Sequence, residues 1–371
     1  MGTARTWDGL LDVPIIDISP FRISPFRESG PTAGGVAADR DTIADRDAVA
    51  ALVDRAAREV GFMQIVGHGI APAVLDRFTS ATDAFFALDL ETKNRYRCPP
   101  GINRGYSPPK SESLVNSLGL TSPADLFEAI NVGVSAADHP GVDLPADDHA
   151  PNDYAPNVYP SEVPDFEAAV SAWFAEAGAV ARTMTRIFGR ALGLGEDYFA
   201  AYTDHSLDVL RMNNYRLPAS EVRLEPDQLG MGAHTDYGIV TVLWADSVPG
   251  LEILDADGRW HPAQPAPGAL LVNLGDGLAR WTNDEWLSTM HRVAPPRVDG
   301  VLVPRRSAAY FHDGNTDAVI ECLPSCVRPG RPAAYAPVTI GEHLRAKLAG
   351  SRAGQLTETA SREAARLGEP G

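Results

Sequence analysis

The sequence predicts a mixed α and β protein whose C-terminal half forms a β-sandwich or jelly roll. From about residue 207 to 321, short runs of Val, Ile, Leu and Trp alternate with Gly, Pro and Asp turns, as expected for repeated short strands. Before that region, long helical patterns alternate with short β-type runs. With 371 residues, 44% of them hydrophobic, the chain can form a sizeable core.

The N-terminal elements follow from periodicity and from turn residues. Apolar side chains recur at helical spacing in "RDAVAALVDRAAREV", whereas "SPFRESGPTAGG" is rich in turn formers and predicts a loop. Proline is favoured in the first turn of a helix, so Pro72 is expected to begin one. The expected order is a strand at 13–19, a loop at 24–35, a helix at 46–60, a strand at 61–70, and a helix from Pro72 through Phe86.

The remaining elements divide the chain into three parts. Segment 134–164 is dense in Pro, Asp, Ala and Gly without a sustained period, so it predicts a long surface loop or a junction between subdomains. Segment 165–194 carries a broad apolar helical stripe. The tail after about residue 342 predicts a polar helix that frays. We therefore expect one compact unit with an N-terminal region at 10–160, a jelly-roll core with its preceding helix at 161–345, and a polar tail at 346–371. The loops at 22–45 and 134–164 are candidates for a lid.

The charge and cysteine content restrict the class of partner. A formal net charge of −17 disfavours nucleic acid and anionic membrane surfaces, which would repel the protein. Three cysteines do not make a disulfide framework, and no stretch approaches the length of a membrane span. A cytoplasmic protein that acts on a small molecule is the expectation.

A metal site is predicted where "GAHTDYG" precedes an apolar run. Side chains at i and i+2 of a strand project from the same side, so His234 and Asp236 can bind one ion, with His291 as the third ligand. Two imidazoles and one carboxylate leave open positions, which suits a non-haem Fe(II) oxygenase but also a hydrolytic zinc site. His312 ends a predicted core strand and is a candidate to contact a metal ligand.

A second cluster, Arg305 and Ser307, favours the oxygenase interpretation. These residues are again at i and i+2, and an Arg fork beside a hydroxyl binds a carboxylate through charge-assisted hydrogen bonds. Such a pair would anchor one carboxylate of a dicarboxylic co-substrate whose other end chelates the metal.

With these motifs in place, the chain resembles the isopenicillin N synthase-like group of Fe(II)- and 2-oxoglutarate-dependent oxygenases. The similarity covers nearly the whole chain and is carried by "VPIIDIS", "GFMQIVGHGI", "NRGYSP", "RMNNYR", "GAHTDYG", "VNLGDGL", "HRV" and "RRSAAYF".

The resemblance implies a distorted jelly roll, or double-stranded β-helix, with flanking helices and a role in secondary metabolism. It implies Fe(II) bound by His234, Asp236 and His291. It also implies 2-oxoglutarate held by Arg305 and Ser307, with Tyr215 and Asn213 beside them. Arg104, Tyr106 and Phe311 are candidate substrate contacts. The expected reaction is oxidation of a small molecule by O2, most simply hydroxylation, with release of succinate and CO2.

Two alternatives remain open at this point. An oxidase without 2-oxoglutarate, performing an isopenicillin N synthase-like cyclisation or ethylene formation, could use the same iron site and a similar Arg-x-Ser pair. A jelly-roll binding module or a zinc hydrolase would leave Arg305 and Ser307 without a role.

Overall fold

The computed structural model describes residues 13–22, 35–99, 101–120, 122–144, 153–215, 225, 228–353, 360, 364 and 367. Two β-sheets of unequal size form the centre of this part of the chain, and helices cover the larger one. The predicted mixture of helices and strands is confirmed.

The larger sheet combines strands from both halves of the sequence. Its strands in spatial order are β1 (Ile15–Asp17), β2 (Phe62–Val66), β10 (Leu270–Leu274), β7 (Val240–Ala245), β14 (Arg306–His312), β5 (Val209–Asn214), β4 (Glu128–Gly133) and β3 (Gly105–Ser107). Only β1 and β2 pair in parallel. The N-terminal region thus completes the same sheet as the C-terminal strands.

The smaller sheet faces the inner side of the larger one. Its order is β6 (Met231–His234), β11 (His291–Val293), β8 (Leu251–Leu254) and β9 (Trp260–Pro262). Two hairpins are formed by β12 (Arg297–Val298) with β13 (Val301–Leu302) and by β15 (Val319–Ile320) with β16 (Val338–Thr339). Apolar side chains of both sheets, among them Tyr215 and Val293, pack in one cluster between them. This two-sheet arrangement is the expected distorted jelly roll.

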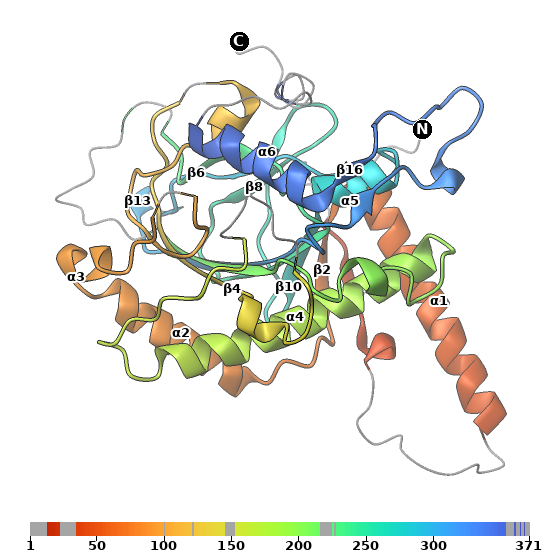
Figure 1. Cartoon of the computed structure of the whole chain (residues 1–371), viewed down its shortest axis with the longest axis horizontal. Helices are drawn as coiled ribbons and strands as arrows, with labels where there is room; N and C mark the ends of the chain where they lie inside the picture. Colours follow the sequence, from red (N-terminus) through yellow and green to blue (C-terminus); the bar gives the residue numbers. More distant parts are fainter. Residues whose placement is uncertain are drawn as a thin grey trace.

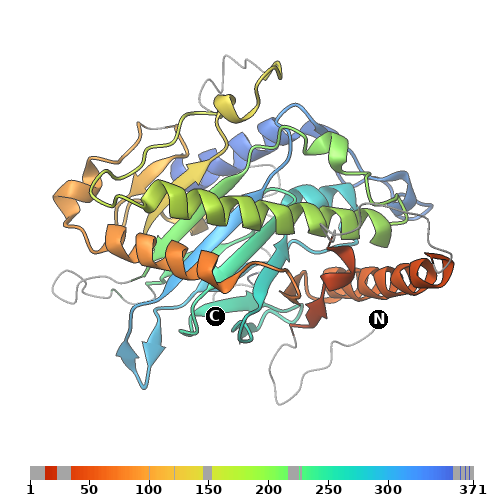
Figure 2. The same ribbon diagram turned by 90° about the horizontal axis from the view of Figure 1, so that it is seen from below.

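Three of the helices named next, α1, α2 and α4, form a layer on the outer face of the larger sheet. The helices are α1 (Gly35–Glu59), α2 (Pro72–Phe86), α3 (Leu90–Asn94), α4 (Phe166–Ala191), α5 (Asp276–Trp281) and α6 (Ile340–Ala353). Helix α4 crosses the outer face of the sheet with α2 beside it, and both lie in front of the strands in Figure 2. Helix α6 lies on the opposite side of the molecule from both (Figure 1).

Successive side chains of β14 point alternately to the outer face of the sheet, where they pack in the core, and to the inner cavity. Tyr310 points outward, where its ring packs edge-on against Phe174 of α4 at 4.9 Å. Ser307, Ala309 and Phe311 point inward and line a cavity between the two sheets. One strand therefore anchors the helix layer with one face and forms the site with the other.

Helix α1 is longer than the sequence pattern predicted. It begins at Gly35, not at residue 46, because the preceding Ala-, Asp- and Arg-rich segment contains good helix formers and no proline. Residues 35–45 of the candidate lid at 22–45 are therefore helical, and residues 23–34 lie outside the described residues. In Figure 1 the N-terminal half of α1 extends away from the sheets, so this part of the expected lid does not cover the cavity.

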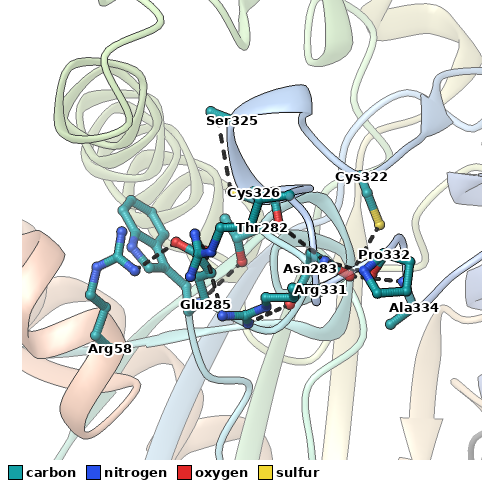
Figure 3. Close-up of polar contacts among 12 residues, drawn as sticks. Arg58, Thr282, Asn283, Glu285, Cys322, Ser325, Cys326, Arg331, Pro332 and Ala334 are labelled. Atoms are coloured by element: carbon teal, nitrogen blue, oxygen red, sulfur yellow. Dashed lines mark hydrogen bonds and ion pairs between the residues drawn. The ribbon is translucent and has the colours of Figure 1, made fainter. Parts of the chain in front are cut away.

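A polar junction fixes the chain that follows α5. Asn283 donates through Nδ2 to the carbonyl oxygens of Cys326 and Pro332, both at 3.1 Å, and its Oδ1 accepts from the Ala334 amide (Figure 3). Glu285 accepts from Arg58 of α1 at 2.8 Å. These contacts attach the long loop at 321–337 and α1 to the base of the core.

Helix α6 is more than a polar tail. It starts at Ile340 and continues past residue 346, so it spans the expected boundary between core and tail. Ile340 and Leu344 are buried, and both Leu344 and Leu348 line the cavity. Its polar composition concealed this contribution. No helix among the described residues is long and apolar enough to cross a membrane.

Candidate active site

The candidate active site is the cavity between the two sheets. Its walls come from inward-facing residues of the larger sheet, such as Asn213 and Ser307, and of the smaller sheet, such as Met231 and His291. Apolar side chains, including Phe62 and Leu243, alternate with a few polar ones, as in most small-molecule sites.

The three expected metal ligands meet in this cavity. Residues His234 and His291 are paired directly across β6 and β11, which places their rings 4.3 Å apart. Oδ1 of Asp236 lies 3.9 Å from Nε2 of His234 and 3.8 Å from Nε2 of His291. Two metal bonds of about 2.1 Å each can span such distances. Among the described residues, this is the only group of three or more His, Cys, Asp or Glu side chains close enough together to hold a metal ion.

Both imidazoles present Nε2 to the metal position. Nδ1 of His234 lies 2.8 Å from the Gly232 carbonyl, and Nδ1 of His291 lies 3.1 Å from the Thr289 carbonyl. Because a carbonyl only accepts, Nδ1 carries the proton in each ring and Nε2 is left to bind a metal. Burial, assisted by His291, lowers the pKa of His234 to about 4, so this imidazole is neutral at physiological pH.

Asp236 is positioned by hydrogen bonds, not by a strand. Strand β6 ends at His234, so Asp236 lies in the following loop and the predicted strand geometry does not account for its direction. Its Oδ2 accepts from the Thr241 hydroxyl at 2.5 Å and from Nδ2 of Asn273 at 2.6 Å. Oδ1 is thereby turned toward the two histidines. Neither Thr241 nor Asn273 was assigned a role from the sequence, although Asn273 lies within the quoted "VNLGDGL".

A buried arginine lies in the same cavity. Arg305 is 2% exposed, and its Nε and Nη1 have no hydrogen-bond partner among the described residues. The guanidinium lies 5.0 Å from the ring centre of Tyr215, and Ser307 and Asn213 are directly paired across β14 and β5. An unpaired buried cation is costly, so this cluster fits a ligand carboxylate. The four expected residues are thus brought together.

The residues present fit both iron and 2-oxoglutarate. The donor set of two imidazoles and one carboxylate oxygen, with open positions beside it, is the set that Fe(II) takes in oxygenases of this kind. The unsatisfied guanidinium in the same cavity matches the far carboxylate of a dicarboxylic acid. Both requirements are met by side chains that point into a single space.

Of the residues expected to contact the substrate or a metal ligand, the structure places some in the cavity and others in the core. Arg104 and Phe311 line the cavity, but Tyr106 does not. Tyr106 lies in the core, where its hydroxyl donates to Glu128 at 2.5 Å and its ring packs against Phe85. His312 points to the outer face of β14 and contacts Asp208 at 2.9 Å, so it does not touch a metal ligand. The alternation that brings Phe311 inward takes His312 outward.

A buried ion pair connects α6 to the metal loop. Nζ of Lys347 lies 2.7 Å from Oδ2 of Asp276, which also accepts from the Thr235 hydroxyl at 3.1 Å. The Asp276 amide donates to the carbonyl of Asp236 at 2.8 Å. Sequence periodicity gave no signal for this contact because the partners are far apart in the chain.

His343 of α6 should make stability depend on pH. Burial lowers its pKa to about 4, against about 6.5 in an unfolded chain, so between these values only the unfolded state binds the proton. His343 should therefore contribute about 3 kcal/mol to the fall in the free energy of unfolding as the pH decreases from 6.5 to 4. Urea unfolding of the metal-free protein at several pH values measures this, with His343→Gln as the comparison. An equally steep decrease in that variant would contradict the assignment to His343.

Comparison with known protein families agrees with this geometry. Residues 13–162 match the family "non-haem dioxygenase in morphine synthesis N-terminal", and residues 207–314 match the "2OG-Fe(II) oxygenase superfamily". The second match spans the metal triad, His234, Asp236 and His291, and also Arg305.

Individual relatives cover most of the chain. The 2-oxoglutarate-Fe(II) type oxidoreductase hxnY of Emericella nidulans is 34% identical over 292 residues, which is 77% of this chain and 79% of that protein. Homoarginine-6-hydroxylase of Oryza sativa subsp. japonica is 30% identical over 338 residues, 89% of this chain and 98% of that protein. The crystal structure of a full-length Neurospora crassa protein in complex with alpha-KG has a TM-score of 0.74 at 28% identity, and the match covers 93% of this chain and 98% of that one. The chain therefore belongs to the 2-oxoglutarate- and Fe(II)-dependent oxygenases of the isopenicillin N synthase-like family.

Proposed function

We propose that this enzyme hydroxylates a small molecule with O2 and releases succinate and CO2. The single observation that carries the proposal is the meeting of an unpaired buried guanidinium, Arg305, with the His234, Asp236 and His291 triad in one cavity. Hydroxylation is the simplest outcome of the family chemistry, and the rice relative is named for that reaction on homoarginine.

Each part of the cavity has a proposed role. His234, Asp236 and His291 bind Fe(II), while Arg305 and Ser307 bind the C5 carboxylate of 2-oxoglutarate, with Tyr215 and Asn213 beside them. When bound, iron and 2-oxoglutarate supply oxidation by O2 coupled to decarboxylation of the co-substrate. Phe311 and Arg104 line the part of the cavity left for the substrate, and the apolar wall with α6 excludes water.

The proposal is tested by measuring succinate release. Purified protein is supplied with Fe(II), 2-oxoglutarate and O2, and candidate small molecules are screened for those that raise succinate formation above the substrate-free rate. Mass spectrometry of the stimulating compound should show a product heavier by one oxygen atom. A product that has lost two hydrogen atoms would contradict hydroxylation while leaving the oxygenase assignment intact.

Arg305→Ala should weaken 2-oxoglutarate binding while Fe(II) still binds. The variant removes a charge-assisted contact to 2-oxoglutarate and leaves the three metal ligands in place. The dissociation constant for 2-oxoglutarate is therefore expected to rise at least about tenfold. Calorimetric titration of the metal-loaded protein with 2-oxoglutarate measures it. Arg306→Ala is the matched control, because the neighbouring Arg306 points outward and pairs with Asp83 at 2.5 Å. Equal affinities for 2-oxoglutarate in the two variants would remove Arg305 from this role.

A further inference from the structure

An unpaired carboxylate lines the cavity at the end away from Arg305. Strand β14 (Arg306–His312) carries Ser307 and Phe311 on its inner face. Arg305 comes directly before the strand and Asp313 directly after it, so the two residues lie at opposite ends. Asp313 is half-buried, and no described residue forms a hydrogen bond or an ion pair with its carboxylate. It is separate from the metal ligands, because the group of residues that could hold an ion contains only His234, Asp236 and His291.

The other charged residues of the cavity already have partners. Arg211 donates to Glu112 at 2.9 Å. Arg104 donates to the backbone carbonyls of Asn103, Val134 and Asp153 at 2.8, 2.7 and 3.2 Å, which commits its two terminal nitrogens, whereas its Nε has no hydrogen-bond partner among the described residues. The Asp153 carboxylate lies 3.4 Å from Arg345.

Iron, Asp236, 2-oxoglutarate and Arg305 are also balanced in formal charge. The two positive charges of Fe(II) and the one of Arg305 offset Asp236 and the two carboxylates of 2-oxoglutarate. Of the acidic residues that line the cavity, Asp313 is therefore the one whose carboxylate is paired by no described residue and is not a metal ligand.

A second hydrogen-bond acceptor lies in the same wall. Asn131 of β4 is 2% exposed and donates through Nδ2 to Oδ1 of Asn103 at 2.9 Å. Its own Oδ1 has no hydrogen-bond partner among the described residues. A buried acceptor without a donor costs free energy, and a ligand with several N–H groups would satisfy it together with the carboxylate.

We propose that Asp313 binds a cationic nitrogen of the primary substrate, so that the substrate class is a protonated amine with an apolar body. This inference rests on the proposed function, because it places the amine in the space that the iron and 2-oxoglutarate leave open. The apolar body packs against Phe311, Val209 and Leu344, which line the same cavity.

The local backbone places the carboxylate beside the metal loop. A Cβ atom at Gly238 would overlap the Asp313 carboxylate, so the absence of a side chain there allows the close approach. Burial, and the nearby carboxylates of Asp208 and Asp236, raise the pKa of Asp313. A bound cation would remove that unfavourable environment, since an opposite charge stabilises the ionised carboxylate.

The test compares amines with alcohols of the same shape. Benzylamine and benzyl alcohol, and cyclohexylamine and cyclohexanol, are titrated calorimetrically into the full-length protein loaded with Fe(II) and 2-oxoglutarate under nitrogen. The wild type should bind each amine at least about tenfold more tightly than its alcohol. Asp313→Asn keeps the shape and the hydrogen-bonding capacity but removes the charge, so the preference for amines should disappear. Asp317→Asn, an exposed position nearby, should leave it unchanged.

Three results would overturn the proposal. They are equal binding of amine and alcohol by the wild type, no binding of either amine, and an amine preference that survives in Asp313→Asn. The visible absorption of the Fe(II) and 2-oxoglutarate complex is recorded in the same samples. If that absorption forms but amines are not preferred, only the substrate class is wrong, whereas its absence would count against the proposed function itself.

Discussion

Asp236→Ala will reduce succinate formation by more than about 100-fold, because even residues that only orient metal ligands are worth about 10–100-fold in affinity or activity. The substitution removes the single carboxylate of the triad. It also leaves the Thr241 hydroxyl and the Asn273 amide without their shared acceptor. Iron content after anaerobic loading and succinate release are the two measurements, and both should fall together.

Asp257→Ala is a suitable control for that experiment. Asp257 lies in the exposed turn between β8 and β9, away from the cavity, so iron content and turnover should match the wild type. Full iron loading and turnover in Asp236→Ala would mean that the ion is bound elsewhere.

Lys347→Met will destabilise the protein by about 3–5 kcal/mol, the usual cost of leaving one member of a buried ion pair without its partner. Lys347 is 1% exposed and its Nζ lies 2.7 Å from Asp276, whose carboxylate would stay buried. Although burial alone would raise the pKa of Asp276, its interactions with Lys347 and His343 lower it overall, so the carboxylate is ionised at neutral pH. Urea unfolding at pH 7 measures the loss.

Two further variants separate charge from packing in this pair. Lys110→Met breaks an exposed pair with Glu225 at 3.9 Å and should cost less than about 1 kcal/mol. Lys347→Met combined with Asp276→Asn removes both buried charges, so part of the lost stability should return. Equal effects of Lys347→Met and Lys110→Met would show that the buried pair does not anchor α6 to the metal loop.

The sequence was sufficient for residues whose positions follow from short-range patterns. Pro72 correctly predicted the start of α2, and repeated short strands separated by turn residues predicted the jelly roll. The triad could be recognised because its three residues, together with Arg305 and Ser307, follow the order and spacing of a known family. Strand alternation does not by itself explain why His234 and Asp236 point to the same metal position. Asp236 lies beyond the end of β6, and hydrogen bonds from Thr241 and Asn273 orient its carboxylate.

The features of the site that could not be predicted from the sequence depend on contacts between segments that are distant in the chain. Tyr106 belongs to a promising loop motif, yet its direction is set by Glu128 on the neighbouring strand β4. The contribution of α6 to the cavity was hidden by its polar composition. That Asp313 has no partner is visible only after the other acidic residues of the cavity have been assigned theirs. Such pairings are decided by tertiary packing, which no local periodicity encodes.

The most direct test of the site is an anaerobic titration of the purified protein with Fe(II) and then 2-oxoglutarate, followed by visible absorption. We expect a charge-transfer band that saturates at one equivalent of each, and that is lost in Asp236→Ala. A wild-type protein that shows no band with both components present would contradict the claim that His234, Asp236 and His291 hold one iron beside the co-substrate.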